Sequence, residues 1–382
     1  MSYRRPTVGI VGAGQLARMM AQAAIPLDIR IVLLAADPND GAAQVVPDVI
    51  VGAPDDPHAL AELGRRCDVI TFDHELVPPE ILAELEAQGQ TVWPSSSSMA
   101  LAQDKRRQRR ELSDAGFPVP PFADLDRFED ITDFGDRHGW PVVIKASRGG
   151  YDGRGVWIAS ARAEAESIWQ GAQRSATVLL AEQLVPLDLE LAVLVARRPS
   201  GEMVVYPPVE TVQRDGICRE LRVPANVSAN LGEDAVRIAR EIAEMIGIVG
   251  IMAIEFFVSD GRLYVNELAP RPHNSGHWTI EGAVTSQFEQ HLRAVLEWPL
   301  GSTRLTGEAV VTINLLGDGE ANDPRKRMRA ALAGTDGHVH FYGKEARAGR
   351  KIGHVTAVAD SIEHASAGAQ RVIDALSGSR NA

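Results

Sequence analysis

Residues 251–278 read Ile251-Met-Ala-Ile-Glu-Phe-Phe-Val258, Ser259-Asp-Gly261, Arg262-Leu-Tyr-Val-Asn-Glu-Leu268 and Ala269-Pro-Arg-Pro-His-Asn-Ser-Gly-His-Trp278. Two apolar runs flank a glycine-containing turn, and this pattern predicts a β-hairpin. A three-residue loop at Ser259–Gly261 would place Val258 opposite Arg262 and Ala253 opposite Glu267.

That register puts Glu255 and Glu267 on one face as diagonal neighbours, roughly 7–8 Å apart at Cα. A two-residue Asp-Gly turn would instead separate them onto opposite faces unless a bulge restored them. Two carboxylates and the Asn266 amide on neighbouring strands suit hard Mg²⁺ ions that hold nucleotide phosphates. The alternative is that both glutamates are solvated on a half-exposed sheet. A dense run of polar groups follows directly and favours a site: Arg271, His273, Asn274, Ser275, His277 and Trp278.

The composition is that of a globular protein large enough for two or three domains. The chain has 382 residues, of which 45% are hydrophobic and 24% charged. An acidic excess of 51 over 39 basic residues gives a net charge of −12, which argues against a nucleic-acid surface. Only Cys67 and Cys218 are present, so neither a disulfide framework nor a zinc site is expected. The chain shows no leader or membrane pattern, and we expect a cytoplasmic protein.

The N-terminal region carries a dinucleotide-binding pattern. Strand-like Thr7–Val11 is followed by Gly12-Ala-Gly14-Gln-Leu-Ala17 and a helical run, and a second strand ends at Asp37, where a ribose-binding acid would lie. An NAD-dependent dehydrogenase is the first interpretation. The same pattern fits any tight βα turn, and no hydride-transfer partner follows, so we expect a Rossmann-like domain that need not hold NAD.

The middle of the chain carries groups that bind phosphate. Residues 104–110 begin a basic helix that ends near Gly116, with Lys105 at its start, and we expect most of its basic side chains to form a solvated cationic face. The run Trp140–Lys145 is strand-like and ends in lysine. Four glycines within Gly149–Gly155 then form a flap whose backbone could approach a phosphate. Lysine at a strand end beside such a flap suits an ATP site better than a flexible surface hairpin.

A strand at 176–183 leads into an apolar connector. A purine could bond to the backbone of this connector and pack on Leu184 and Val185. Glu190, eight residues after Glu182, could accept hydrogen bonds from ribose hydroxyls, although either glutamate could equally be a surface residue.

With these motifs assembled, the chain resembles the ATP-grasp enzymes and, among them, the family of N5-carboxyaminoimidazole ribonucleotide synthetases. Asn266-Glu-Leu-Ala-Pro-Arg271 is shared widely among ATP-grasp ligases. Gly149-Gly-Tyr-Asp-Gly-Arg-Gly155 together with His273-Asn-Ser-Gly-His-Trp278 is narrower and indicates this family. Further matches are Gly12-Ala-Gly-Gln-Leu16, Tyr206-Pro, Asp215-Gly, Met252-Ala-Ile-Glu255, Tyr342-Gly-Lys-Glu and Gly349-Arg-Lys-Ile-Gly-His354.

The resemblance implies a mixed α/β and α+β fold in three parts. These are a Rossmann-like domain at 1–97, an ATP-grasp domain at 98–300 with a flap-bearing subdomain at about 118–186, and a β-rich domain at 301–382. It also implies carboxylation of 5-aminoimidazole ribonucleotide with ATP and bicarbonate through carboxyphosphate, a role for Mg²⁺, and a homodimer.

Matched position by position, the resemblance assigns four groups of residues. The ATP site would comprise Lys105, Lys145, Gly150, Tyr151, Asp152, Gly153, Arg154, Gly155, Val156, Glu182, Gln183, Leu184, Val185, Glu190, Asn266 and Glu267. The metal ligands would be Glu255 and Glu267. The catalytic groups would be Arg271, His273 and Asn274, with Arg271 holding bicarbonate and His273 a base, given its usual pKa near 6.5, or a structural group. The ribonucleotide would bind Glu75, Tyr151, Asp152, Arg154, Lys344, Arg350 and Lys351.

Three positions depart from the family pattern. Members often carry Glu where Asp73 stands and Asn or His where Leu76 stands, which weakens the assignment of Glu75. Gln213 replaces a frequent histidine and is left out of the site. Formate-dependent glycinamide ribonucleotide transformylase is the nearest rival within the ligases, and a catalytically silent binding protein is a further alternative.

Overall fold

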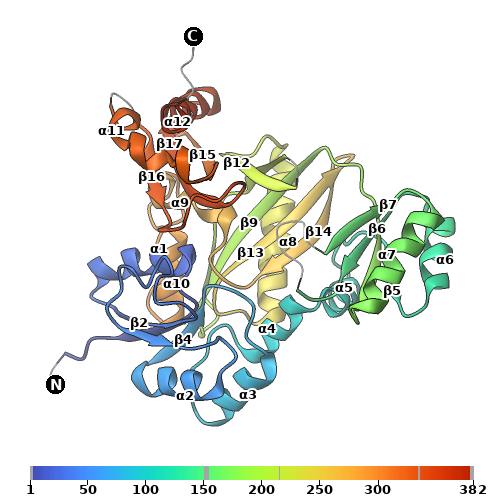
Figure 1. The fold of residues 1–382 in the computed structure, drawn as a ribbon, viewed down its shortest axis with the longest axis horizontal. Coiled ribbons are helices and arrows are strands. Elements are labelled where there is room, and N and C mark those ends of the chain that lie inside the picture. Colours follow the sequence, from blue (N-terminus) through green and yellow to red (C-terminus); the bar gives the residue numbers. More distant parts are fainter. Residues whose placement is uncertain (1–2, 150–154, 215, 334–335, 379–382) are drawn as a thin grey trace.

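The computed structural model describes residues 3–149, 155–214, 216–333 and 336–378. Its N-terminal part is a four-stranded parallel sheet in the order β3-β2-β1-β4 (Figure 1). The strands are β1 (Thr7–Val11), β2 (Arg30–Ala35), β3 (Val49–Val51) and β4 (Val69–Phe72), and the helices are α1 (Gln15–Ala24), η1 (Ile25–Leu27), α2 (Pro57–Arg66) and α3 (Pro79–Ala87). The strands are almost wholly apolar because helices cover both faces of the sheet: α2 and α3 pack on one face and α1 on the other.

A second, antiparallel sheet in the order β5-β8-β6-β7 forms the flap-bearing part, seen in green at the right of Figure 1. It is reached through α4 (Ser96–Gln103) and α5 (Lys105–Asp114). Its elements are β5 (Phe122–Leu125), α6 (Phe128–His138), β6 (Val142–Ala146), β7 (Val156–Ala159), α7 (Arg162–Arg174) and β8 (Leu179–Gln183). Apolar side chains of α6 and α7 pack on one face of this sheet, and together they form a core of their own.

The large sheet has nine strands in the order β14-β13-β9-β11-β12-β15-β17-β16, with β10 on β9. The strands are β9 (Leu189–Arg197), β10 (Met203–Val205), β11 (Val209–Arg214), β12 (Ile217–Val223), β13 (Gly250–Ser259), β14 (Arg262–Ala269), β15 (Ala309–Leu316), β16 (His338–Phe341) and β17 (Lys351–Ala359). Because β15 pairs with β12, the sheet continues unbroken past position 300. The division into domains at 97 and 300 therefore stays a proposal.

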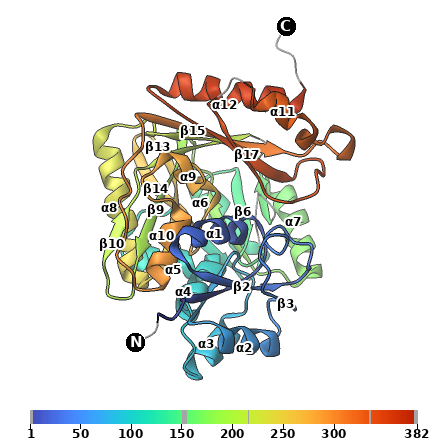
Figure 2. The same cartoon turned by 90° about the vertical axis from the view of Figure 1, so that its left-hand side faces the viewer.

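Helices cover both faces of the large sheet. The helices of this region are α8 (Ala229–Ile246), η2 (Asn274–Gly276), α9 (Thr279–Gly282), α10 (Gln287–Val295), η3 (Glu320–Asn322), η4 (Pro324–Arg327), α11 (Met328–Ala331) and α12 (Ile362–Ser377), of which α8, α9, α10 and α12 contact the sheet. The apolar face of α10 joins the core of α1, so the first sheet and the large sheet share packing. Figure 2 shows α11 and α12 above the C-terminal strands, with the first domain below them. None of the helices in the described ranges has the length and apolar character needed to cross a membrane.

Candidate active site

The β13–β14 hairpin turns on two residues, not three. Ser259 pairs with Arg262, and both Asp260 (φ 48°) and Gly261 (φ 68°) have positive φ angles, as a type I′ turn requires. The expected three-residue loop is therefore wrong, and so are two pairings that followed from it. Val258 lies opposite Leu263, and Ala253 lies opposite Ala269.

A β-bulge brings the two glutamates back onto one face. The register shifts between Glu255 and Phe256, which leaves Asn266 as the extra residue on β14. Glu255 and Glu267 are consequently direct cross-strand partners rather than diagonal neighbours. Of the two outcomes foreseen for an Asp-Gly turn, this is the one in which a bulge restores the shared face.

The two glutamates have different electrostatic environments, because only Glu267 is paired with a cation. Both side chains are half-buried. Partial burial and then the carboxylate of Glu267 raise the pKa of Glu255 well above its usual value. Burial also acts on Glu267, but Lys105, whose Nζ lies 3.0 Å from its Oε1, lowers the pKa of Glu267 overall. Facing carboxylates of this kind fit a divalent cation between them, with phosphate or water completing its shell. Within the described ranges, no three His, Cys, Asp or Glu side chains converge as a metal site of their own.

Lys145 lies at the end of β6, as the sequence predicts, and its side chain is beside Asn266 of β14. Its Nζ lies 2.7 Å from Glu182 Oε2 and 3.3 Å from Asn266 Oδ1. The flap begins just beyond it, because Val156 of β7 pairs with Lys145 and the N–H of Ala146 donates to the carbonyl of Gly155. The flap residues Gly150, Tyr151, Asp152, Gly153 and Arg154 lie outside the described residues.

The expectation that most of the basic residues after Lys105 form a solvated face is wrong for two of them. Arg109 is fully buried: its Nε donates to Glu182 Oε1 at 2.8 Å, and its Nη2 donates to the carbonyl of Asn266 at 2.6 Å. Arg106 is also largely buried and donates to backbone carbonyls under the small sheet. The sequence interval between Arg109 and the buried Leu112 was the available sign that this face turns inward.

The connector after β8 is partly exposed, as a nucleotide-binding edge must be. Glu182 is buried, and its two oxygens contact Arg109 and Lys145, whereas Leu184 is 38% exposed. Glu190 of β9 accepts a long hydrogen bond of 3.5 Å from Gln213, so Gln213 lies beside a predicted ATP-site residue although it was left out of the site. Gln183 and Val185 flank Leu184 on the same connector.

The loop after β14 brings the catalytic candidates to the glutamates. His273 Nδ1 accepts the backbone N–H of Ser275 at 3.3 Å, so its Nε2 carries the proton and points toward Glu255 Oε1, 3.7 Å away. Burial, followed by the charge of Arg271, lowers the pKa of His273 well below 6.5. The imidazole is therefore neutral, and its pKa lies below the value near 6.5 that we expected from the sequence. Asn274 begins η2 beside it.

The first domain reaches the same loop through the end of β4. Glu75 Oε1 lies 2.8 Å from Arg271 Nε. Asp73 accepts the N–H of Gly14 at 2.6 Å, and a Cβ at Gly12 would lie 1.9 Å from Asp73 Oδ1. The carboxylate of Asp73 thus fills the helix N-terminus where a dinucleotide pyrophosphate would bind, which removes the structural basis for the dehydrogenase interpretation.

The C-terminal strands complete the junction. Residues 343–351, which run from the β16–β17 connection to the first residue of β17 and which we call the cationic loop, include Lys344, Arg350 and Lys351. Lys344 Nζ donates to Gln15 Oε1 of the first domain, and Gln44 Nε2 donates to the carbonyl of Gly343 at 2.8 Å. Gln15 was not predicted as a site residue, although it lies within the glycine-rich motif.

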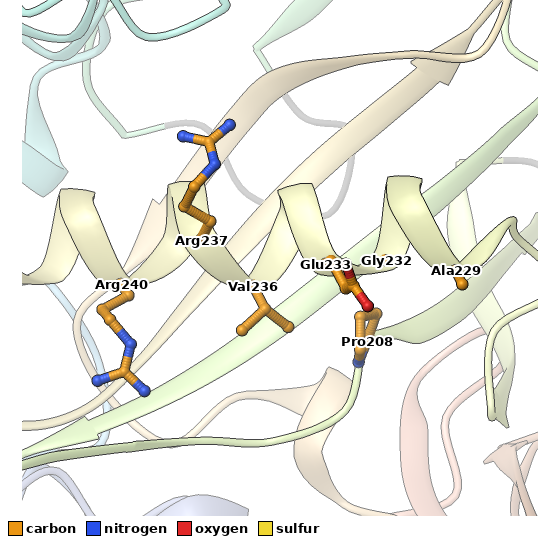
Figure 3. A pocket seen from close by; sticks show the side chains of 7 residues that line it. All are labelled: Pro208, Ala229, Gly232, Glu233, Val236, Arg237 and Arg240. Carbon is orange, nitrogen blue, oxygen red and sulfur yellow. The ribbon is translucent and has the colours of Figure 1, made fainter.

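A separate hollow of about 520 Å³ lies beside α8 (Figure 3). Ile254 and Phe256 of β13 face the core under this helix, so Glu255 projects from the opposite face of the sheet. The hollow is therefore not part of the glutamate site. It is lined by Pro208, Ala229, Gly232, Glu233, Val236, Arg237 and Arg240.

Comparisons with known proteins agree with this geometry. Three family models match in order: the ribonucleotide synthetase preATP-grasp domain at residues 5–103, the ATP-grasp domain at 110–288, and the phosphoribosylaminoimidazole carboxylase C-terminal domain at 310–368. The N5-carboxyaminoimidazole ribonucleotide synthase of Mycobacterium tuberculosis is 44% identical over 366 residues, which cover 94% of this chain and 85% of that protein.

Solved structures of such enzymes are similar to this chain over almost its whole length. The N5-carboxyaminoimidazole ribonucleotide synthetase of Thermus thermophilus has a TM-score of 0.88 at 36% identity, covering 98% of this chain and 99% of that one. The Aspergillus clavatus synthase in complex with ADP and 5-aminoimidazole ribonucleotide has a TM-score of 0.89 at 31% identity, covering 97% and 98%. The predicted resemblance and fold class are confirmed. The chain belongs to the N5-carboxyaminoimidazole ribonucleotide synthase family of ATP-grasp enzymes.

Proposed function

We propose that this chain carboxylates 5-aminoimidazole ribonucleotide at its amine, using ATP and bicarbonate and passing through carboxyphosphate, in purine biosynthesis. The observation that carries the proposal is the junction at which three parts of the fold place opposite charges side by side. The ATP-grasp part supplies the glutamate pair and Lys105. Glu75 of the first domain pairs with Arg271 of the loop that follows the second glutamate, and the cationic loop of the C-terminal strands contacts Gln15 of the first domain.

The phosphoryl-transfer half of the reaction needs charge neutralisation and alignment. Glu255 and Glu267 would hold Mg²⁺, which supplies positive charge to the phosphate oxygens when it is bound. Lys105 and Lys145 add ammonium groups from α5, which begins at this edge, and from β6, which ends there. Asn266, whose side-chain oxygen accepts from Lys145, keeps that ammonium group at the edge of β14.

The bicarbonate half falls to the loop after β14. Bicarbonate is a poor electrophile until it is phosphorylated, and its carboxyphosphate form must be kept from water. Arg271 would hold both anions in place of its present partner Glu75. Neutral His273, with the proton on Nε2, can donate a hydrogen bond to an anion beside Glu255. Asn274, at the start of η2, is our third candidate here.

Binding of the ribonucleotide falls to the junction of the first and C-terminal parts. Lys344, Arg350 and Lys351 give a local cationic surface within an acidic chain and suit a phosphate monoester. Glu75 could accept from the ribose or the amine once it leaves Arg271. Tyr151, Asp152 and Arg154 of the flap are assigned to the same substrate by resemblance alone. Through the same resemblance we propose a cytoplasmic homodimer.

ADP release by the purified chain tests the proposal. We expect release that requires both 5-aminoimidazole ribonucleotide and bicarbonate, with one carbamate formed per ADP. The matched control replaces these two substrates with glycinamide ribonucleotide and formate, which the rival transformylase would use. ADP release with the second pair and none with the first would overturn the assignment.

A further inference from the structure

Three histidine rings form one stack where the C-terminal strands meet the loop after β14. His340 of β16 and His354 of β17 are partners in the strand register, with ring centroids 4.6 Å apart and planes inclined by 18°. His354 stacks in turn on His277, at 5.0 Å and 28°. Both His277 and His354 are fully buried. The proposed mechanism uses none of these rings, although they lie between its two binding regions.

Two of the rings are anchored at their edges to different segments. His340 Nε2 lies 2.6 Å from Glu281 Oε1 on α9. His354 Nδ1 lies 2.8 Å from the hydroxyl of Tyr342, the residue that precedes the cationic loop. The flat faces pack against each other while the ring edges bond to polar groups. A phenylalanine could supply the packing but not the anchoring, which explains why the stack is made of histidines.

The third ring connects the stack to the catalytic loop. Gln287 of α10 accepts the N–H of His273 at 2.9 Å and donates to the carbonyl of the same residue at 2.8 Å. These two bonds fix the orientation of its amide, so its nitrogen also points to Nδ1 of His277, 3.3 Å away. His273 in turn faces Glu255 at 3.7 Å. The stack is thus continuous, through Gln287, with the metal-binding edge.

At its other end the stack holds the base of the cationic loop. The N–H of Tyr342 donates to the carbonyl of Ile352 at 2.9 Å and closes the loop. Lys344 Nζ lies 5.9 Å from the centroid of the Tyr342 ring, within the range of a cation–π contact. The hydroxyl of Tyr342 is therefore the link between His354 and the loop that carries Lys344.

The two fully buried rings of the stack, His277 and His354, add no charge to a cationic neighbourhood. Burial, then the charges of Lys351 and His340, lower the pKa of His277 to about 3. Burial also lowers the pKa of His354 well below 6.5. Neutral rings can therefore lie beside Lys351 and Arg271 without repelling them, so the cations can gather around a substrate phosphate.

We propose that His340, His354 and His277 are positioning residues that hold the cationic loop in register with His273 and Glu255. Their role is to place the ribonucleotide amine at the phosphorylated bicarbonate. This inference rests on the proposed function, because it takes the cationic loop as the phosphate-binding segment.

Kinetics of the full-length chain test the inference with Tyr342→Phe and His354→Phe. Each removes one buried polar contact and keeps an aromatic ring. We expect KM for 5-aminoimidazole ribonucleotide to rise about tenfold while KM for ATP stays within about twofold. His338→Gln, at an exposed histidine of the same β16 strand, is the matched control and should change neither. An unchanged ribonucleotide KM, or equal rises for both substrates, would overturn the positioning role.

A second readout does not depend on turnover. Amide hydrogen exchange across residues 342–353 should be faster in Tyr342→Phe than in the wild type or in His338→Gln. Unchanged exchange there refutes the inference, whatever substrate the enzyme uses. If the wild-type enzyme shows no ADP release that depends on ribonucleotide and bicarbonate, only the proposed function is contradicted. If His354→Phe does not fold, Tyr342→Phe, which removes a single oxygen atom, still tests the inference.

Discussion

Glu182→Gln should cost more stability than any other single change at the nucleotide edge. The two oxygens of Glu182 contact Arg109 Nε at 2.8 Å and Lys145 Nζ at 2.7 Å. The side chains of Glu182, Arg109 and Lys145 are 2%, 0% and 8% exposed, so solvent screens the cluster very little. Without the carboxylate charge, two buried cations lose their counter-ion. Breaking a buried ion cluster in this way costs about 3–5 kcal/mol.

The acid titration of the same carboxylate gives a second magnitude. Burial raises the pKa of Glu182, but Arg109 and Lys145 outweigh it and lower the value from 4.5 to about 2. The unfolded chain therefore binds this proton at a higher pH than the folded chain. The stabilisation is complete above pH 4.5 and is lost as the pH falls toward 2. That difference corresponds to roughly 3 kcal/mol at pH 7, in line with the loss expected for the variant.

Urea unfolding at pH 7 measures the loss directly. The matched control is Glu241→Gln, which breaks an exposed ion pair with Arg237 on α8 whose side chains are 46% and 56% exposed. Exposed pairs contribute little, so the control should lose less than about 0.5 kcal/mol. If Glu182→Gln unfolds within about 1 kcal/mol of the wild type, the buried cluster does not stabilise the fold as argued.

Four further results are expected. Gly12→Ala should destabilise the chain by at least about 3 kcal/mol in urea, because its Cβ would lie 1.9 Å from a carboxylate oxygen, whereas Gly89→Ala, with a positive φ but nothing within 4 Å, should cost only about 1 kcal/mol. Burial lowers the pKa of His291 from 6.5 to about 3, so this residue should contribute up to about 1.4 kcal/mol per pH unit to the fall in the free energy of unfolding below pH 6.5. His291→Gln should reduce the slope by that contribution, and an unaltered slope would contradict the lowered pKa of His291. Glu267→Gln should abolish Mg²⁺-dependent ADP release and keep the circular dichroism spectrum; near-normal turnover would exclude a metal role. Lys344→Ala should raise KM for the ribonucleotide and leave KM for ATP unchanged, and a parallel rise in both would count against a phosphate contact.

The sequence predicts the hairpin and its carboxylates well because both depend on local patterns. The strand register was harder to predict. The two-residue turn alone would put the two glutamates on opposite faces, and the bulge brings them back onto one face. A sign of the bulge is nonetheless present in the sequence. Leu263 and Val265 share one core with Leu268, so the apolar alternation changes parity between them, at Asn266. A strict period of two would have put Leu268 on the other face.

Contacts between distant segments could not be predicted from local pattern. From the sequence, Arg109 is expected to be a surface residue on a basic helix. Its burial is possible because Glu182 of β8 lies beside it and compensates its charge. Thr71 of β4 and His291 of α10, which share a hydrogen bond of 2.7 Å, are 220 residues apart in the chain. Propensity and spacing describe neighbours along the chain, whereas these partners are set by how the sheets pack.

The ion pairs of this structure share a logic that connects its stability with its chemistry. Lys105 pairs with Glu267, and Arg271 pairs with Glu75, although each of the four has a proposed ligand as its eventual partner. A half-buried charge left alone would be costly, so each side chain compensates another in the free protein. Under the proposed function, binding would proceed by exchange: Glu267 would turn from Lys105 to a divalent cation, and Lys105 would turn to a phosphate. Each exchange replaces one charge contact with another, so the charged groups are already in place when substrates arrive, and little reorganisation remains for the reaction itself.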